Sequence, residues 1–170
     1  YLCWQRKNHM APVRNIIFDY GGVLFGVDYH RTEKAFDDSG FPGFGEFFSK
    51  QKQTRLFDDL EKGGISADGF REGIREASGK AWSDDVIDSC WNAMLLGSPA
   101  WIFPMLEEAA SRYRIFLLSN TNPIHEAAFM RMNREQHDLN DIATYFERAY
   151  YSHRIGKRKP DLEIFQWVMR

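Results

Sequence analysis

The sequence is poor in cysteine, in net charge and in long apolar stretches, and each shortage excludes a class of protein. Only Cys3 and Cys90 occur among the 170 residues, too few for a disulfide framework or a cysteine-based metal centre. The formal net charge is −2, without the basic excess typical of nucleic-acid-binding domains. No apolar stretch approaches the roughly 20 residues that a membrane-spanning helix needs. We therefore expect a cytoplasmic protein with no nucleic-acid or membrane partner, in which Cys90 is a buried core residue.

Apolar and aromatic residues are plentiful, at 44% and 15% of the sequence. This is enough for the core of one domain with a small insert. The segment 1–8 lacks the apolar stretch of a signal peptide. His9 and Met10 are typical of a cloning junction, so we expect residues 1–10 to be a remnant of cloning and the native chain to start at Met10.

The most informative segment is an apolar run that ends in Asp19 and is followed by the pair Gly21 and Gly22. The run predicts a buried strand over residues 13–18. Asp19 is then expected at the carboxyl end of a central strand, where open α/β sheets bind their ligands. The glycines allow the backbone to turn sharply and to approach a ligand closely. At this point Asp19 is either a nucleophile or a residue that begins a turn, since Asp is common in both settings.

The pattern then changes from strand to helix. Residues 26–97 mix polar and apolar positions at helical spacing, and Ser66 and Ser83 stand where helix N-caps are expected. The helix after Ser83 is predicted to bury the stripe Val86, Ile87, Cys90, Trp91, Met94 and Leu95. Gly26 and Gly97, at the two ends of this helical segment, are candidate hinges.

Strands are predicted again at residues 115–118 and 149–152, and a last helix opens at Pro160. This order of elements predicts an α/β fold, a Rossmann-like parallel sheet flanked by helices, with a small helical cap inserted after the first strand. The predicted domains are an α/β core of residues 11–25 and 98–170 and a helical cap of residues 26–97.

Polar residues at the ends of the predicted strands point to phosphoryl transfer. Asp19 ends the first strand, Ser119 and Asn120 end the second, and a later loop contains Lys159. A carboxylate, a hydroxyl with neighbouring backbone N–H groups and a lysine are what in-line transfer of a phosphoryl group needs. Asp19 would form an aspartyl phosphate, and Lys159 would neutralise charge. Ser119, Asn120 and Gly22 are the predicted phosphate-binding positions. Taken singly, Ser119 is a common turn residue and Lys159 an ordinary surface lysine.

The order of these segments resembles the haloacid dehalogenase-like (HAD) hydrolase superfamily. Its three motifs are similar to residues 18–24 (FDYGGVL), 117–121 (LLSNT) and 156–160 (GKRKP). Residues 57–70 resemble the small helical cap of its phosphatase branch, in particular that of small sugar-phosphate phosphatases. The resemblance implies a phosphatase of a small phosphorylated metabolite. It also implies Mg²⁺ held by Asp19 and by the backbone carbonyl of Gly21.

Two departures from the family pattern bear on the chemistry. Most of its phosphatases carry a second Asp two positions after the nucleophile, as general acid and base, and this position is Gly21 here. The proton for the leaving group must then come from water, His30 or, in our preferred interpretation, Asp28. The acidic fourth motif, which supplies carboxylate to the metal, is absent before Arg170. We therefore expect the C-terminal part of the core to be missing, because the natural protein is longer, or Mg²⁺ to bind weakly.

Three functions remain open. The first is the phosphatase. The second is a metal-independent 2-haloacid dehalogenase, in which Asp19 attacks carbon and displaces halide; Gly21 fits it, although such enzymes carry Tyr-Gly-Thr at residues 21–23. The third is a catalytically degenerate module that binds a phosphorylated ligand. No pattern in residues 50–101 identifies the substrate, and the oligomeric state is equally open.

Overall fold

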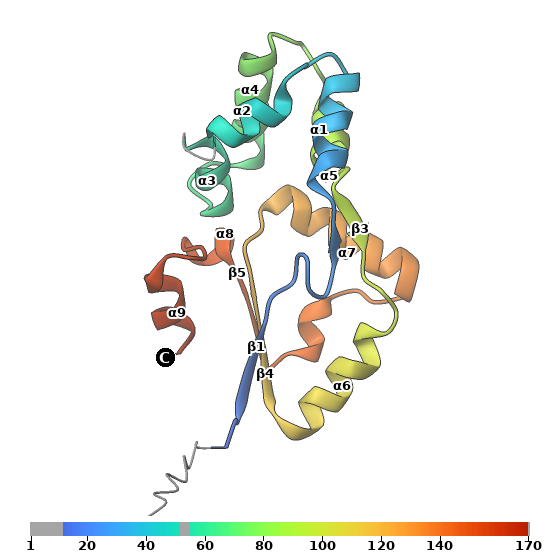
Figure 1. Cartoon of the computed structure of the whole chain (residues 1–170), viewed down its shortest axis with the longest axis vertical. Coiled ribbons are helices and arrows are strands. Elements are labelled where there is room, and N and C mark those ends of the chain that lie inside the picture. The colour runs from blue at the N-terminus through green and yellow to red at the C-terminus, as the bar shows by residue number, and fades with distance from the viewer. Residues whose placement is uncertain (1–11, 52–54, 170) are drawn as a thin grey trace, which may run out of the picture.

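The structure is a computed structural model that describes residues 12–51 and 55–169. Its centre is a three-stranded parallel sheet in the order β1-β4-β5. The strands are β1 (Asn15–Phe18), β4 (Arg114–Ser119) and β5 (Arg148–Tyr151). The elements around them are α6 (Ile102–Arg112), α7 (Pro123–His137), the 3₁₀ helix η1 (Ile142–Tyr145), α8 (Ser152–Ile155) and α9 (Leu162–Val168). Figure 1 shows α9 on one side of the sheet and α6 and α7 on the other. The predicted α/β class is confirmed.

The chain between residues 26 and 97 forms a helical layer over one end of the sheet (Figure 1). Its elements are β2 (Gly26–Val27), α1 (Tyr29–Asp38), α2 (Phe44–Gln51), α3 (Leu56–Glu61), α4 (Ala67–Ser78), α5 (Asp84–Asn92) and β3 (Leu95–Gly97). We call residues 26–97 the cap. The strands β2 and β3 pair antiparallel, with Gly26 opposite Gly97. The two glycines predicted as hinges are thus bound to each other where the chain enters and leaves the cap.

The register of the sheet brings the motif-bearing strand ends together. Phe18 pairs with Leu117, and Ser119 pairs with Tyr151. Because the strands are parallel, their carboxyl ends lie at one edge, under the cap. The prediction that Asp19 follows a central, buried strand is wrong for the part of the chain that the structure describes. There β1 is an edge strand, and Ile17 is 44% exposed because one face of β1 is uncovered.

Local capping agrees with the sequence at the two predicted N-caps, Ser66 and Ser83. The Ser66 hydroxyl accepts a hydrogen bond from Gly69 N at 3.1 Å, and the Ser83 hydroxyl accepts one from Val86 N at 3.4 Å. The helix after Ser83 is shorter than predicted, however. It ends at Asn92, and Leu95 belongs to β3 because Asp28 N–H bonds Met94 O there. Val86, predicted in the buried stripe, is 36% exposed.

The described residues form three clusters of buried side chains, and the two larger ones correspond to the sheet layer and the cap; the third, smaller cluster joins Ile164 of α9 to Leu118 and Tyr150 of the sheet. The sheet cluster is centred on Leu117, Ile115 and Phe129, and the cap cluster on Phe36, Phe44 and neighbouring rings. Cys90 lies in the cap cluster and is 5% exposed, which confirms its prediction as a core residue. Burial of such apolar surface is worth about 25 cal/mol per Å², so each layer has its own source of stability. We keep the domain boundaries as a proposal.

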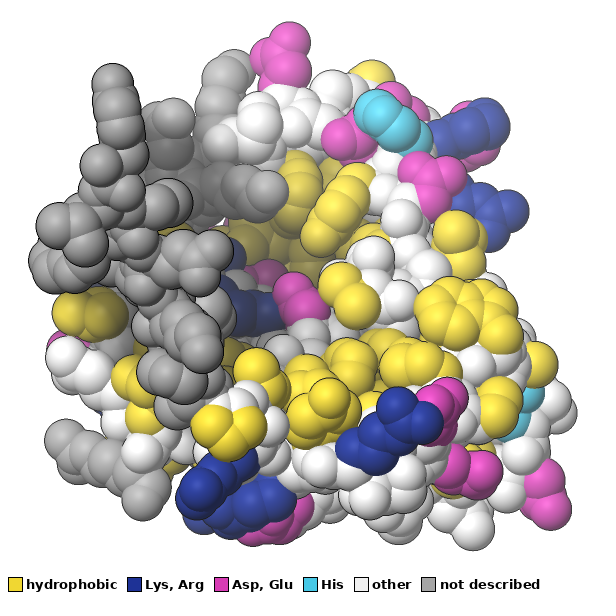
Figure 2. All heavy atoms as spheres, turned by 60° about the horizontal axis from the view of Figure 1, so that its bottom comes forward, with side chains coloured by type: hydrophobic (Ala, Val, Ile, Leu, Met, Phe, Trp, Pro, Cys, Tyr) yellow, Lys and Arg dark blue, Asp and Glu magenta, His cyan; other side chains and the backbone are white. Residues whose placement is uncertain are grey.

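Surface charge follows the near-neutral composition. On the face turned to the viewer in Figure 2, Lys and Arg side chains stand beside Asp and Glu side chains rather than in a block of one sign. Among the helices of residues 12–51 and 55–169, none is long and apolar enough to cross a membrane.

Candidate active site

Asp19 follows β1 directly and has one carboxylate oxygen held in place. Its Oδ1 accepts a hydrogen bond from Tyr20 N at 2.7 Å and lies 2.6 Å from Lys159 Nζ. Within the described residues, the other oxygen, Oδ2, has no hydrogen bond or ion pair, and the side chain is 45% exposed. A carboxylate fixed through one oxygen and open at the other has the geometry that a nucleophile needs.

Lys159 is held in position by Leu118 in β4 and by Asn120, which directly follows β4. Its ammonium group donates to Leu118 O at 2.9 Å as well as pairing with Asp19. The Asn120 amide makes two further bonds to the backbone of Lys159. Its Nδ2 donates to Lys159 O, and its Oδ1 accepts from Lys159 N, both at 2.8 Å. The structure therefore brings Asp19, Asn120 and Lys159 together, and it uses the Asn120 side chain to position the lysine.

Ser119 and Thr121 complete this edge of the sheet. Ser119 is 2% exposed, and its hydroxyl lies 3.4 Å from Asn120 O, a long contact that leaves the hydroxyl available to a ligand. Thr121 is tied to Ser152, whose hydroxyl accepts from Thr121 N and donates to Thr121 O, both at 2.9 Å. Sequence reasoning did not find Ser152 as a support. The available signal was a serine at the end of the third predicted strand.

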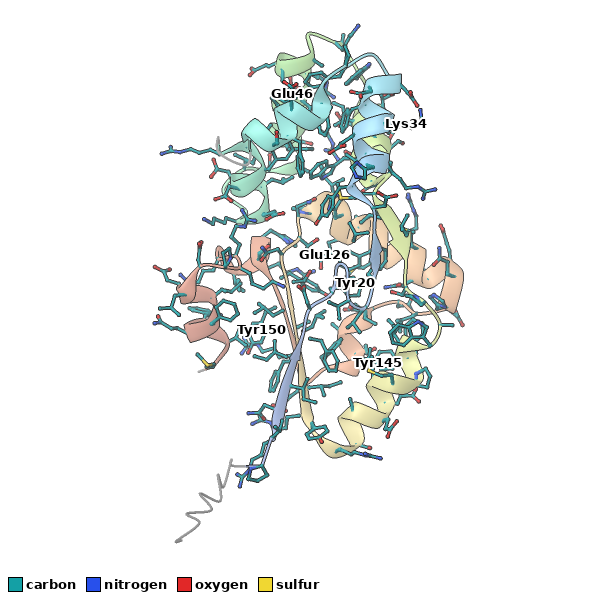
Figure 3. The ribbon with its side chains drawn as sticks, viewed as in Figure 1. Tyr20, Lys34, Glu46, Glu126, Tyr145 and Tyr150 are labelled. Carbon is teal, nitrogen blue, oxygen red and sulfur yellow. The ribbon has the colours of Figure 1, made fainter. Side chains whose placement is uncertain are left out.

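Two further supports lie behind the strand ends, where Figure 3 places Tyr20 and Glu126. The Tyr20 hydroxyl accepts a hydrogen bond from Asn133 Nδ2 at 2.8 Å, which ties the loop after Asp19 to α7. The buried Glu126 carboxylate accepts from His153 Nε2 at 3.0 Å and pairs with Arg154 at 2.7 Å. Neither connection had a signature in the sequence, because each joins residues far apart in the chain.

The glycine pair forms the predicted sharp turn, but the Gly22 N–H is used within it. Gly22 has φ of 79°, in the region that favours glycine. Its N–H bonds Phe25 O at 2.8 Å, so this predicted phosphate donor already has an acceptor. The Gly21 carbonyl accepts none of the hydrogen bonds of this turn, whose N–H groups go to Tyr20 O and Phe25 O. A carboxylate and a free carbonyl are hard oxygen donors that fit Mg²⁺.

Metal ligands are few in the described residues, where no group of three or more His, Cys, Asp or Glu side chains could hold an ion. Mg²⁺ usually keeps several waters and binds through one or two carboxylates together with substrate phosphate. Asp19 and the Gly21 carbonyl meet that requirement.

Asp28, the preferred candidate for acid-base chemistry, is the N-cap of α1. Its Oδ1 accepts a hydrogen bond from His30 N at 3.1 Å. His30 is exposed, and its ring lies 3.1 Å from the Glu33 carboxylate. Both side chains therefore have structural partners of their own, and neither lines the cavity described next.

A cavity of about 90 Å³ lies between the cap and the strand ends. Its floor includes Gly21, Ser119 and Asn120, and its cap side includes Tyr29 and Glu61. Sites for drug-sized ligands have volumes of about 300–1,000 Å³, so this cavity suits a small leaving group. Its position joins the predicted phosphate-binding residues to the cap.

Ion pairs connect the cap to the loop that contains Lys159. Arg158 pairs with Asp58 and, at 3.0 Å from Nε to Oε2, with Glu61. Lys62 lies 3.2 Å from Asp161. The backbones also meet closely here, because a Cβ on Gly63 would lie 2.2 Å from a backbone oxygen of the core, that of residue 153. The structure thus has the cap closed against the loop of the third motif.

His125, on α7, connects the core to the cap from inside the cavity wall. Its ring stacks on Trp91 with centroids 4.8 Å apart. Nδ1 faces the donating amide of Asn122 at 3.1 Å, and Nε2 faces Trp91 O at 3.2 Å. The proton therefore belongs on Nε2. Burial lowers the pKa of His125 to about 4, so the ring is neutral at pH 7.

The depressed pKa of His125 predicts a loss of stability in mild acid. The unfolded chain takes up this proton near pH 6.5, above the folded-state value. The free energy of unfolding is therefore expected to fall between about pH 6.5 and about pH 4, by about 3 kcal/mol in full. Urea unfolding at about pH 7 and about pH 4.5 measures this fall. His125→Phe keeps the stacked ring, and its free energy of unfolding is expected to fall less between the two pH values. An equal fall in both proteins would contradict the attribution of the loss to His125.

Comparison with models of known protein families finds no match. Individual proteins do match. A curated D-ribitol-5-phosphate phosphatase of Bacteroides thetaiotaomicron is 30% identical over 164 residues, which are 93% of this chain and 76% of that protein. A crystal structure of a HAD family enzyme from the same organism has a TM-score of 0.85 and 35% identity, covering 92% of this chain and 77% of that one. The structure of a HAD-like family hydrolase from Porphyromonas gingivalis has a TM-score of 0.80 and 30% identity, covering 92% and 75%.

The fold and these similarities define the class of protein. The three sequence motifs implied a parallel α/β core under a helical cap, with a carboxylate, a serine and a lysine at the strand ends. The structure has this arrangement. The chain belongs to the HAD family. The predicted family membership is therefore confirmed.

Proposed function

We propose that this protein is a Mg²⁺-dependent phosphatase of small phosphorylated metabolites. The observation that carries the proposal is the half-open carboxylate of Asp19, with Oδ1 held by Tyr20 N and Lys159 Nζ. The curated relative is a phosphatase, which supports this enzyme class. The Bacteroides HAD enzyme was also crystallised with magnesium and inorganic phosphate, at 34% identity to this chain and a TM-score of 0.83.

The chemistry would proceed in two displacements at phosphorus. Asp19 Oδ2 attacks phosphorus, the bond from phosphorus to the leaving-group oxygen breaks, and the leaving group departs with a proton taken from solvent. Water then attacks the phosphorus of the aspartyl phosphate, which frees Asp19 and inorganic phosphate. The Asp19 side chain is 45% exposed, so water reaches it. We assign the leaving-group proton to water because Asp28 is engaged as a helix cap.

The remaining residues would stabilise charge. Lys159 lies 2.6 Å from Asp19 Oδ1 and would neutralise charge on the transferring group. The Ser119 hydroxyl and the Asn120 N–H would donate to phosphoryl oxygens. Asp19 and the Gly21 carbonyl would hold Mg²⁺, which offsets the repulsion between the anionic nucleophile and the anionic substrate.

Metal removal tests this proposal. Phosphate release from a panel of small phosphomonoesters is expected with Mg²⁺ and is expected to fall at least about 100-fold with a chelator, because the two anions then meet without a counter-ion. Restored release on adding Mg²⁺ back excludes damage by the chelator. Turnover that is indifferent to the chelator, or halide release from a 2-haloacid, would favour the dehalogenase. Phosphate binding without turnover would favour the binding module.

A further inference from the structure

The cavity beside Asp19 has one charged wall. Of the described side chains that line it, Glu61 is the only carboxylate, and no Lys or Arg lines it. The rest of the cap side is aromatic and includes Tyr29, Phe48 and Trp91. Trp91 is 4% exposed, and its indole N–H has no acceptor in the described part of the chain. A leaving group in this cavity therefore meets aromatic rings and one anion.

Glu61 is held in place rather than left to swing into solvent. It is the last residue of α3, and its carboxylate lies 3.0 Å from Arg158 Nε, with the two side chains 28% and 23% exposed. Tyr29 lies within reach of the charges of both Glu61 and Asp19. Burial raises the pKa of the Tyr29 hydroxyl, and these two negative charges raise it further. Asp19 itself does not line the cavity, but Gly21, Ser119 and Asn120 do, so Glu61 faces the predicted phosphate-binding positions from the opposite, cap side.

We propose that Glu61 selects the leaving group, by accepting hydrogen bonds from the hydroxyl groups of a neutral polyol or sugar phosphate and by repelling a leaving group that carries a second anion. This inference rests on the proposed phosphatase function. Hydroxyl groups donate well to carboxylates, and hydrogen bonds to charged acceptors are stronger than neutral ones. Aromatic walls suit the C–H faces of such a molecule. Specificity of this kind needs both the attraction and the repulsion.

The cavity is small while the cap is closed. Its volume of about 90 Å³ is that of about three water molecules, so it holds only part of a chain of carbons and hydroxyls. A second phosphate or a carboxylate at the far end of that chain would meet the charge of Glu61, whose side chain is 28% exposed, and repulsion at a partly buried charge is stronger than in bulk water.

The test compares three substrates in two variants. The substrates are D-ribitol 5-phosphate, the matching acid D-ribonate 5-phosphate, and p-nitrophenyl phosphate, which has no hydroxyl chain. Glu61→Gln is expected to lower kcat/KM for the polyol phosphate about 10- to 100-fold, mainly through KM. The kcat/KM for the acid phosphate is expected to rise or stay level, so the ratio of kcat/KM for the polyol phosphate to that for the acid phosphate falls. Hydrolysis of p-nitrophenyl phosphate is expected to stay within about twofold.

Asp58→Asn is the matched control. Asp58 is on the same helix and pairs with the same Arg158, but it does not line the cavity. Asp58→Asn is expected to change kcat/KM for all three substrates by the same factor. Glu61→Asp retains the negative charge, so it is expected still to discriminate against the acid phosphate. An unchanged polyol-to-acid ratio in Glu61→Gln, or a ratio that shifts equally in Asp58→Asn, would overturn the inference. If the wild-type chain hydrolyses none of the three substrates with Mg²⁺, the proposed function fails instead.

Discussion

Asp19→Asn is expected to lower phosphate release by about 10⁴- to 10⁶-fold, the range seen when an enzyme loses its nucleophile. The asparagine amide keeps the size of the side chain and keeps an oxygen for the Tyr20 N–H bond of 2.7 Å. It cannot form an aspartyl phosphate, because the amide is a poor nucleophile at phosphorus. Initial rates with Mg²⁺ and a saturating phosphomonoester measure the effect. Phosphate binding is expected to survive, since Lys159 and Ser119 remain.

The control for this substitution is Asp38→Asn. Asp38 is a 63% exposed carboxylate that pairs with a lysine, Lys34, on α1. It is expected to leave turnover within about twofold, because an exposed pair of this kind contributes little. A trapped phosphoryl group on wild-type Asp19, detected by mass spectrometry after rapid acid quench and absent from Asp19→Asn, would identify the intermediate. Turnover above about 1% of wild type in Asp19→Asn would exclude Asp19 as the nucleophile.

The sequence predicted the parts of the fold that depend on local chemistry. Apolar runs with a following polar residue located β1, β4 and β5, and Ser66 and Ser83 were recognised as caps because a hydroxyl in front of an apolar stripe can accept a free N–H. The short pairing of β2 with β3 was missed. The strand β2 has two residues and β3 has three, which is too short for a visible alternation of apolar and polar residues. The strands form because the two segments that connect the cap to the core meet in space.

The candidate site shows the same division. Asp19 and Lys159 were found from their positions after strands and in the third motif, and the structure brings them within 2.6 Å. The backbone N–H of Asn120 was predicted to bind phosphate, and the structure adds a second part for this residue, because its side chain bonds the lysine backbone 39 residues away. Gly22 was predicted as a phosphate-binding position, and its N–H closes the turn onto Phe25 O. Such partners depend on tertiary contacts that no spacing in the sequence encodes.

The cap supplies the part of the site that the sequence could not resolve. Glu61 lay in a segment predicted only as helix, between Leu60 and the glycines that end α3. The structure shows that Glu61 lines the cavity and pairs with Arg158, the residue before Lys159. The contact between cap and core and the position of Lys159 thus depend on one loop, so we expect closure of the cap and placement of the lysine to be coupled.

Lys159→Met is expected to lower kcat by about 10²- to 10³-fold, the loss typical of removing one group that stabilises transition-state charge. Methionine is an unbranched side chain only one atom shorter than lysine, but it loses the bonds from Nζ to Leu118 O at 2.9 Å and to Asp19 at 2.6 Å. Lys157→Met is the matched control. Lys157 belongs to the same loop and is 28% exposed, against 21% for Lys159, but it pairs with Glu163. It is expected to leave kcat within about twofold.

Asn120→Ala separates positioning from charge at this lysine. It removes the two 2.8 Å bonds to the Lys159 backbone and leaves the ammonium group in place, so a smaller loss of about tenfold in kcat is expected. In the Lys159→Met background the same change is expected to cost almost nothing, because Asn120 acts through the lysine and the two losses are not additive. Kinetics of the double-mutant cycle measure this coupling. Fully additive losses would show that the Asn120 side chain does not act through the lysine.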